Sequence, residues 1–114
     1  MHEASIALAI IEAAQKLVDE GKVEGKVAAV CVRVGRLTAV VPENLRFLFE
    51  ALVRDTPLAG ARLEVEEVPV RARCGACRHE FEIDEPFFLC PRCDSPDVLV
   101  LTGRELAIEA LEVD

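Results

Sequence analysis

Two stretches of the chain place apolar residues at the spacing of one helix face. The first recurs at steps of three and four, stops before Gly21, and predicts a helix over residues 4–20. The second follows Pro42, which is tolerated in a first helical turn, and continues until Asp55-Thr56-Pro57. It predicts a helix over residues 43–54.

Three other stretches alternate apolar and polar residues with the period of two that a half-buried strand requires. They span residues 27–34, 62–70 and 105–113. The alternation of the second slips at Glu66-Glu67, which predicts a bend or bulge, and Pro69 favours a place near a sheet edge. The third also contains good helix formers, but its first apolar residues alternate, and we interpret it as a strand.

Four cysteines form two pairs after the second predicted strand. Cys74-x2-Cys77 and Cys90-x2-Cys93 are twelve residues apart, and the spacing within each pair lets both sulfurs reach ~2.3 Å from one Zn²⁺. Four thiolates leave no open coordination position for water, so the predicted zinc is structural. An iron site for electron transfer, which uses the same ligands, is the competing interpretation.

The residues between the two pairs predict a short hairpin. Residues 79–83 and 86–89 would form its strands, with Phe81, Ile83 and Phe88 covering the metal. A module of some 30 residues has too few apolar side chains to fold alone, while structural zinc supplies roughly 10–16 kcal/mol in small peptides. The sequence therefore predicts a zinc ribbon.

The predicted fold class is α+β, with two helices packed on a small three-stranded sheet and the zinc ribbon as an insertion. We expect residues 1–70 and 101–114 to form one domain and residues 71–100 to form the ribbon. The fifth cysteine, Cys31, is expected to be a small buried thiol among Val and Ala. His79 is expected to be an exposed imidazole that does not replace a cysteine ligand.

The composition excludes several function classes. With 52% hydrophobic residues the chain can form a core, and its net charge of −8 repels nucleic-acid phosphates. The uncharged stretch 4–11 is far shorter than the ~20 residues of a membrane-spanning helix, and the chain does not begin with the positive charge of a secretory signal. We therefore expect no nucleic-acid partner, no membrane partner and a cytoplasmic location.

The chain begins with Met1-His2-Glu3, which can bind a metal through its backbone. The terminal amine, the backbone nitrogens of residues 2 and 3 and the His2 imidazole can present four nitrogens in one plane, a set that suits Ni²⁺ or Cu²⁺. Glu3 is the first acid of the predicted helix, where it favours the helix dipole and a bound cation. A frayed terminus without metal is the competing interpretation.

Together these features resemble the HypA/HybF hydrogenase nickel-incorporation family. The resemblance covers nearly the whole chain, except that Asp94-Ser95 follows the last cysteine where a glycine is common. It is carried by Met1-His2-Glu3, Val34-Gly35-Arg36-Leu37, Pro42-Glu43-Asn44-Leu45-Arg46-Phe47, Gly60-Ala61-Arg62-Leu63, Cys74-x2-Cys77 and Cys90-Pro91-x-Cys93.

The resemblance implies a function and partners. It implies that Met1, His2 and Glu3 bind Ni(II) as exchangeable cargo, and that Cys74, Cys77, Cys90 and Cys93 bind structural Zn(II). The implied partners are the nickel-handling GTPase of the pathway and the hydrogenase large-subunit precursor, and a homodimer stays open.

We therefore predict a nickel metallochaperone, not an enzyme, that delivers Ni(II) during NiFe-hydrogenase maturation. A zinc-ribbon adaptor that binds only protein and carries no exchangeable metal is the alternative from another class. An iron electron carrier is a third hypothesis. Nickel titration of protein with a native N-terminus separates the first hypothesis from the other two.

Overall fold

The computed structural model describes residues 2–114. The chain divides into two compact units. One contains residues up to Arg33 together with Val40–Glu66 and Ala107–Asp114, and the other contains Val34–Ala39 and Glu67–Leu106. The expected division at residues 70/71 and 100/101 into a nickel-binding domain and a zinc ribbon stays a prediction.

Two helices of the first unit pack against each other. They are α1 (Glu3–Asp19) and α2 (Pro42–Leu52), and both predicted helices are confirmed. Pro42 occupies the first turn of α2 as expected, and the helix passes at its end into the 3-10 turn Val53–Asp55. Much of each predicted apolar face is buried, although Ala13 of α1 and Leu52 of α2 are exposed. The buried residues of the two helices are Ile6, Ala7, Ile10, Ile11 and Ala14 of α1 and Leu45 and Phe49 of α2.

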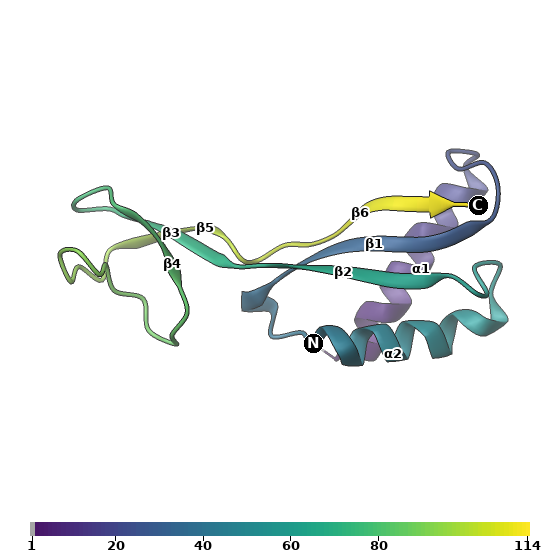
Figure 1. The fold of residues 1–114 in the computed structure, drawn as a ribbon, viewed down its shortest axis with the longest axis horizontal. Coiled ribbons are helices and arrows are strands. Elements are labelled where there is room, and N and C mark those ends of the chain that lie inside the picture. Colours follow the sequence, from purple (N-terminus) through teal and green to yellow (C-terminus); the bar gives the residue numbers. More distant parts are fainter. Residues whose placement is uncertain (1) are drawn as a thin grey trace. The chain divides into compact units, whose positions relative to one another are not determined.

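The first sheet has three strands in the order β2-β1-β6, and α1 crosses behind it in the view of Figure 1. The strands are β1 (Val27–Gly35), β2 (Arg62–Val68) and β6 (Leu106–Val113). At the ends of β1, the Asp114 N–H donates to the Lys26 carbonyl at 3.0 Å and the Gly35 N–H donates to the Glu105 carbonyl at 2.7 Å. The α+β class and the strand interpretation of residues 105–113 are confirmed.

The predicted strand over residues 62–70 is two strands. β2 ends at Val68, and β3 (Val70–Cys74) belongs to the second sheet. Pro69 lies between them, and proline has no N–H to donate to a strand ladder. The break therefore lies at Pro69 and not at the predicted Glu66-Glu67, and it separates strands of two sheets instead of bending one strand.

The second sheet has the order β4-β3-β5, with β4 (Glu80–Ile83) and β5 (Val98–Thr102) both antiparallel to β3. The predicted hairpin between residues 79–83 and 86–89 is wrong, because β4 pairs with β3 and residues 86–89 form no strand. The first cysteine pair thus turns the chain from β3 into β4. Pro86 could not donate a ladder hydrogen bond in any case.

Two glycines allow a close backbone approach within the second unit. A Cβ on Gly35 would collide with the backbone of Gly103, whose own φ is +121°. The Gly103 carbonyl accepts a hydrogen bond from the Leu37 N–H at 2.8 Å, and Arg36 forms ion pairs with Glu67 and Asp84. Gly35 and Gly103 are therefore required by packing, because any side chain at Gly35 would displace this turn.

Neither α1 nor α2 has both the length and the apolar character that a membrane-spanning helix needs, within the residues that the structure describes.

Candidate metal centre

The second unit brings the four paired cysteines together. The sulfurs of Cys74, Cys77, Cys90 and Cys93 all lie within 4.8 Å of one another. The Cys74 and Cys93 sulfurs are 3.5 Å apart, and those of Cys77 and Cys90 are 3.6 Å apart. Separations of this size match the edges of a tetrahedron of thiolates around a metal ion with bonds of ~2.3 Å.

Each cysteine pair is shaped as a turn whose backbone N–H groups point at a sulfur. The N–H groups of Ala76 and Cys77 donate to the Cys74 Sγ, both at 3.3 Å, and the Arg92 N–H donates to the Cys90 Sγ at 3.4 Å. Such hydrogen bonds favour the thiolate that a metal requires. The two turns therefore hold the sulfurs in a form ready for metal binding.

The two turns also end in the same backbone conformation. Arg78 and Asp94, each four residues after the first cysteine of its pair, have φ values of 66° and 60°. Their N–H groups donate to the carbonyls of Cys74 at 3.0 Å and of Cys90 at 2.8 Å. Aspartate tolerates the left-handed region better than most residues, so Asp94 can close the turn without a glycine.

The sulfurs differ in exposure. Cys74 and Cys90 are fully buried in the core of the unit with Val70, Ala72, Phe81 and Ile83, whereas Cys77 and Cys93 are exposed. Phe88 is half-buried and packs against the same core. Phe81, Ile83 and Phe88 thus pack around the buried cysteines, as predicted for a cover of the metal site. Phe81 and Ile83 lie on β4, within the predicted strand 79–83, whereas Phe88 lies in no strand.

The pKa values of Cys74 and Cys93 are shifted in opposite directions. The backbone N–H of Cys77 contributes most to lowering the pKa of Cys74 to about 6, and the N–H of Ala76 adds to it. The Ser95 N–H favours the Cys93 thiolate, but the hydrogen bond with Cys74 and burial together raise the pKa of Cys93. One thiolate beside a thiol is what a metal site shows before the metal displaces the remaining protons.

The N-terminal candidate ligands lie at the start of α1. Met1 lies outside the described residues. His2 is exposed, has extended backbone angles and precedes the first helical residue, and its carbonyl accepts hydrogen bonds from the N–H groups of Ser5 and Ile6 at 3.1 and 3.2 Å. Glu3 is half-buried, and its Oε1 accepts a hydrogen bond from the Val41 N–H at 3.4 Å. Val41 directly precedes α2, so Glu3 joins the starts of the two helices.

His79 is not a member of the four-sulfur cluster. Its ring stacks on Phe81 with a centroid distance of 5.9 Å and an interplanar angle of 18°, and the residue is half-buried. The residue is thus less exposed than expected, because Phe81 covers one face of the ring. The expectation that four cysteines suffice agrees with the geometry.

Sequence reasoning missed the surroundings of Cys31. This thiol is only half-buried, on the central strand β1, and its sulfur lies 3.5 Å from Glu64 Oε2 and 3.7 Å from Glu112 Oε1. The two glutamates come from the neighbouring strands β2 and β6. Burial raises the pKa of the Cys31 thiol to about 11, with the hydrogen bond and charge of Glu64 and the charge of Glu112 adding to the shift.

Cys31 is therefore expected to resist alkylation. At pH 8 a thiol with a pKa near 11 has about 100-fold less thiolate than one at the usual 9.0, so iodoacetamide should modify Cys31 about 100-fold more slowly. Glu64→Gln and Glu112→Gln should each accelerate the reaction, while Glu109→Gln on the same strand as Glu112 should not. Mass spectrometry of the Cys31 peptide measures the rate, and equal rates in all variants would contradict the electrostatic origin of the slow reaction.

Comparisons with known proteins match the whole chain. A family model described as "Hydrogenase/urease nickel incorporation, metallochaperone, hypA" matches residues 1–113. The hydrogenase maturation factor HypA of Desulfosudis oleivorans is 50% identical over 113 residues, which cover 99% of this chain and 98% of that protein. The HypA of Geobacter metallireducens is 41% identical over the full length of both chains.

A solved structure has the same fold. The solution structure of the Ni metallochaperone HypA from Helicobacter pylori superposes with a TM-score of 0.68 at 23% sequence identity, covering 99% of this chain and 97% of that chain. The fold and the cysteine cluster define a small α+β metal-binding protein with a four-thiolate centre that fits zinc. The chain belongs to the HypA family of hydrogenase/urease nickel-incorporation metallochaperones.

Proposed function

We propose that this chain captures Ni²⁺ with Met1, His2 and Glu3 and delivers it during hydrogenase maturation, while its four cysteines hold a structural Zn²⁺. The observation that carries the proposal is the place of His2 and Glu3. They stand at the exposed beginning of α1 in a member of a nickel-incorporation family. A metal bound at a chain end can be passed on by ligand exchange, because one side of it stays accessible to a partner.

The start of α1 also supports binding through backbone nitrogens. The first N–H groups of a helix have no carbonyl partner within the helix. The nitrogens of His2 and Glu3 are of this kind, since α1 begins at Glu3. A metal ion can therefore replace their protons without breaking hydrogen bonds of the helix.

The Glu3 carboxylate has a supporting role in this proposal. Its hydrogen bond from the Val41 N–H at 3.4 Å fixes the first turn of α1 against the residue that precedes α2. This contact restricts the backbone next to His2. We infer that Glu3 contributes to the nickel site through its backbone and by positioning, more than by donating a carboxylate oxygen.

The zinc part of the proposal rests on the donor set. Four sulfurs complete a tetrahedral shell, so the centre holds residues 71–100 together and offers no position for a reacting water. The chain then acts as a carrier and not as an enzyme. We assign nickel capture to the domain of residues 1–70 and 101–114.

The proposed setting follows from the relatives that are called hydrogenase maturation factors. We expect the chain to work in the cytoplasm with the nickel-handling GTPase of the pathway and the hydrogenase large-subunit precursor. These partners would take nickel from the exposed His2 end.

Nickel titration tests the capture site, and the two histidines of the chain provide a matched pair. Protein with a free Met1 amine should bind one Ni²⁺ per chain, and His2→Ala should weaken binding by about 100-fold or more, because it removes the imidazole that closes a chelate ring with the nitrogen of residue 2. His79→Ala should leave nickel affinity unchanged. Tight binding by His2→Ala, or its loss in His79→Ala, would contradict the N-terminal site.

Elemental analysis and absorbance of the same preparation distinguish zinc from iron. One Zn²⁺ per chain and a colourless solution are expected. A coloured protein with one iron per chain would instead support the electron carrier.

A further inference from the structure

Three side chains that can bind a metal meet on the first sheet. Cys31 lies on the central strand β1, and Glu64 and Glu112 lie on its two neighbours, β2 and β6. One atom of each, a sulfur and two carboxylate oxygens, lies within 4.8 Å of the other two. Apart from the four cysteines, this is the one such group among residues 2–114. The sheet therefore gathers a mixed set of one sulfur and two oxygens.

Hydrogen bonding satisfies only part of this cluster. The Cys31 sulfur lies 3.5 Å from Glu64 Oε2 and 3.7 Å from Glu112 Oε1. A thiol has one proton, so it can donate to one carboxylate at a time, and the other carboxylate then faces a sulfur lone pair. A cation between the three atoms would attract all of them at once.

The distances within the cluster match a tetrahedral metal shell. A metal–sulfur bond of ~2.3 Å and metal–oxygen bonds of ~2.0–2.2 Å place sulfur and oxygen about 3.5–3.7 Å apart at the tetrahedral angle. The two sulfur–oxygen distances around Cys31, 3.5 and 3.7 Å, lie in this range. They therefore already fit a bound ion.

The charges around the cluster favour a divalent cation. Arg62 Nη2 lies 3.3 Å from Glu64 Oε1, which leaves Glu64 Oε2 for a metal. Glu112 forms no ion pair within the part of the chain that the structure describes. A thiolate and two carboxylates carry three negative charges, which a divalent ion and Arg62 together neutralise.

The next position along the same two strands shows the contrast. Two residues after Cys31 and Glu64, the Arg33 Nε pairs with the Glu66 Oε2 at 3.4 Å. There the side chain from β1 itself brings the positive charge to the glutamate. At Cys31 the side chain from β1 is a further metal ligand, so the positive charge must come from elsewhere.

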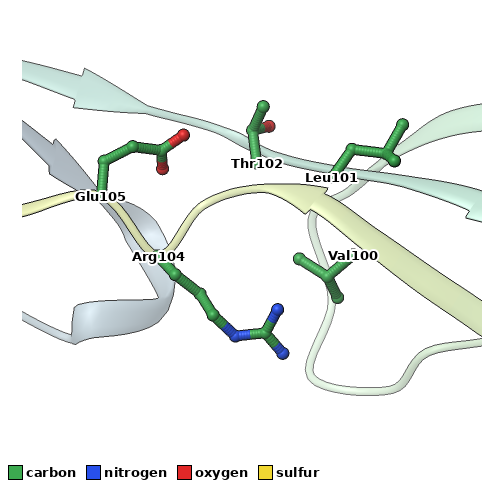
Figure 2. A pocket seen from close by; sticks show the side chains of 5 residues that line it. All are labelled: Val100, Leu101, Thr102, Arg104 and Glu105. Atoms are coloured by element: carbon green, nitrogen blue, oxygen red, sulfur yellow. The ribbon is translucent and has the colours of Figure 1, made fainter.

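The hollow beside β5 has no comparable set among its described residues. Its volume is about 320 Å³, and it is lined by Val100, Leu101, Thr102, Arg104 and Glu105. Glu105 is the one carboxylate among them, and its Oε1 accepts a hydrogen bond from the Gly103 N–H at 2.7 Å. Figure 2 shows the side chains of Arg104 and Glu105 extending to opposite sides of the ribbon, so they do not converge on one ligand.

We propose that Cys31, Glu64 and Glu112 form a further metal site, which binds a divalent cation of intermediate softness such as Zn²⁺ or Co²⁺. Thiolates favour soft ions and carboxylates favour hard ones, so the mixed set suits ions between these classes. Three protein ligands leave a coordination position open to water or to a group of another molecule. Both glutamates are exposed, so a bound ion exchanges with solvent and is held less tightly than an ion between the four cysteines.

Cobalt titration of the full-length His2→Ala protein tests this site independently of nickel capture. The four cysteines are first loaded with zinc, which thiolates prefer, and the titration is done without oxygen. We expect one Co²⁺ per chain by equilibrium dialysis and a sulfur-to-cobalt charge-transfer band in the near ultraviolet. Added Zn²⁺ should bleach the band, whereas Mg²⁺ should not, because Mg²⁺ prefers oxygen ligands.

Variants in the same background assign the band to the three residues. Cys31→Ser should abolish the band. Glu64→Gln and Glu112→Gln should each weaken cobalt binding by at least about 10-fold, since even groups outside the ligand shell contribute that much to metal affinity. Glu109→Gln removes the same charge from β6 and should bind cobalt like the parent protein.

Three results would overturn the site. A parent protein without the band and without the additional Co²⁺ shows that the cluster binds no such ion. A band that persists in Cys31→Ser shows that the cobalt is bound by other cysteines. Equal affinity in Glu64→Gln, Glu112→Gln and Glu109→Gln shows that the carboxylates are not ligands. Far-ultraviolet circular dichroism and zinc content of each variant confirm that the fold is kept.

Discussion

Cys77→Ser and Cys93→Ser should release the metal and unfold residues 71–100 as fully as Cys74→Ser and Cys90→Ser do. Cys77 and Cys93 are exposed, whereas Cys74 and Cys90 are buried. The exposed and the buried cysteines therefore differ in packing and have only the proposed metal in common. If the metal holds the second unit together, substitution of an exposed cysteine should unfold the unit as fully as substitution of a buried one. If side-chain packing holds the unit together, only substitution of the buried Cys74 and Cys90 should be harmful.

The size of the expected effect follows from the small core of this unit. Its buried cluster contains six residues, and two of them, Cys74 and Cys90, are proposed zinc ligands. Structural zinc contributes roughly 10–16 kcal/mol in small peptides, which is more than such a core can replace. Loss of any one ligand should therefore unfold the unit at 25 °C while α1 and α2 remain.

Hydrogen exchange measured by NMR resolves this prediction residue by residue. Protection should vanish over 71–100 in each ligand variant and persist in α1. Cys31→Ser is the matched control, since it makes the same chemical change in the first unit and should keep both the zinc and the protection. A Cys77→Ser protein that retains protected β3 and β4 strands would show that packing suffices.

The parts of the fold that repeat with a clear period could be predicted from the sequence. The helical spacing before Gly21 and after Pro42 gave both helices to within two residues at each end. The two cysteine spacings identified all members of the sulfur cluster. In these cases the signal is local, because a helix face and a two-ligand turn are completed within a few residues.

The parts that depend on pairing between distant strands could not be predicted. β5 is a continuous apolar run with no alternation of polar residues, so periodicity does not distinguish it from a loop or a buried helix. The partner of β4 depends on where β3 begins, which Pro69 decides. The carboxylates beside Cys31 come from residues 33 and 81 positions away, and only the register of three strands brings them together.

Acetylating the Met1 amine should abolish tight nickel binding although every side chain is retained. In the native chain the amine and the nitrogen of residue 2 close a five-membered ring with the metal, and the imidazole of His2 closes a six-membered ring. An acetyl group removes the amine from this set, because the nitrogen becomes an amide. We expect nickel affinity to fall by at least about 100-fold, as for loss of the imidazole, because the metal then loses one ring of the chelate.

The pH dependence follows from the same chemistry. The amine and the backbone amides must lose protons before they bind, so the affinity of the native chain should rise with pH. Calorimetry at two pH values on native, acetylated and His2→Ala proteins, with equal zinc content, measures both effects. A chain with one glycine added before Met1 is the contrasting variant and should keep tight binding, because its amine, two backbone nitrogens and the same imidazole close two five-membered rings and one six-membered ring. If the acetylated chain binds nickel as tightly as the native one, the terminal amine is not a ligand, and the rest of the chain must hold nickel without it.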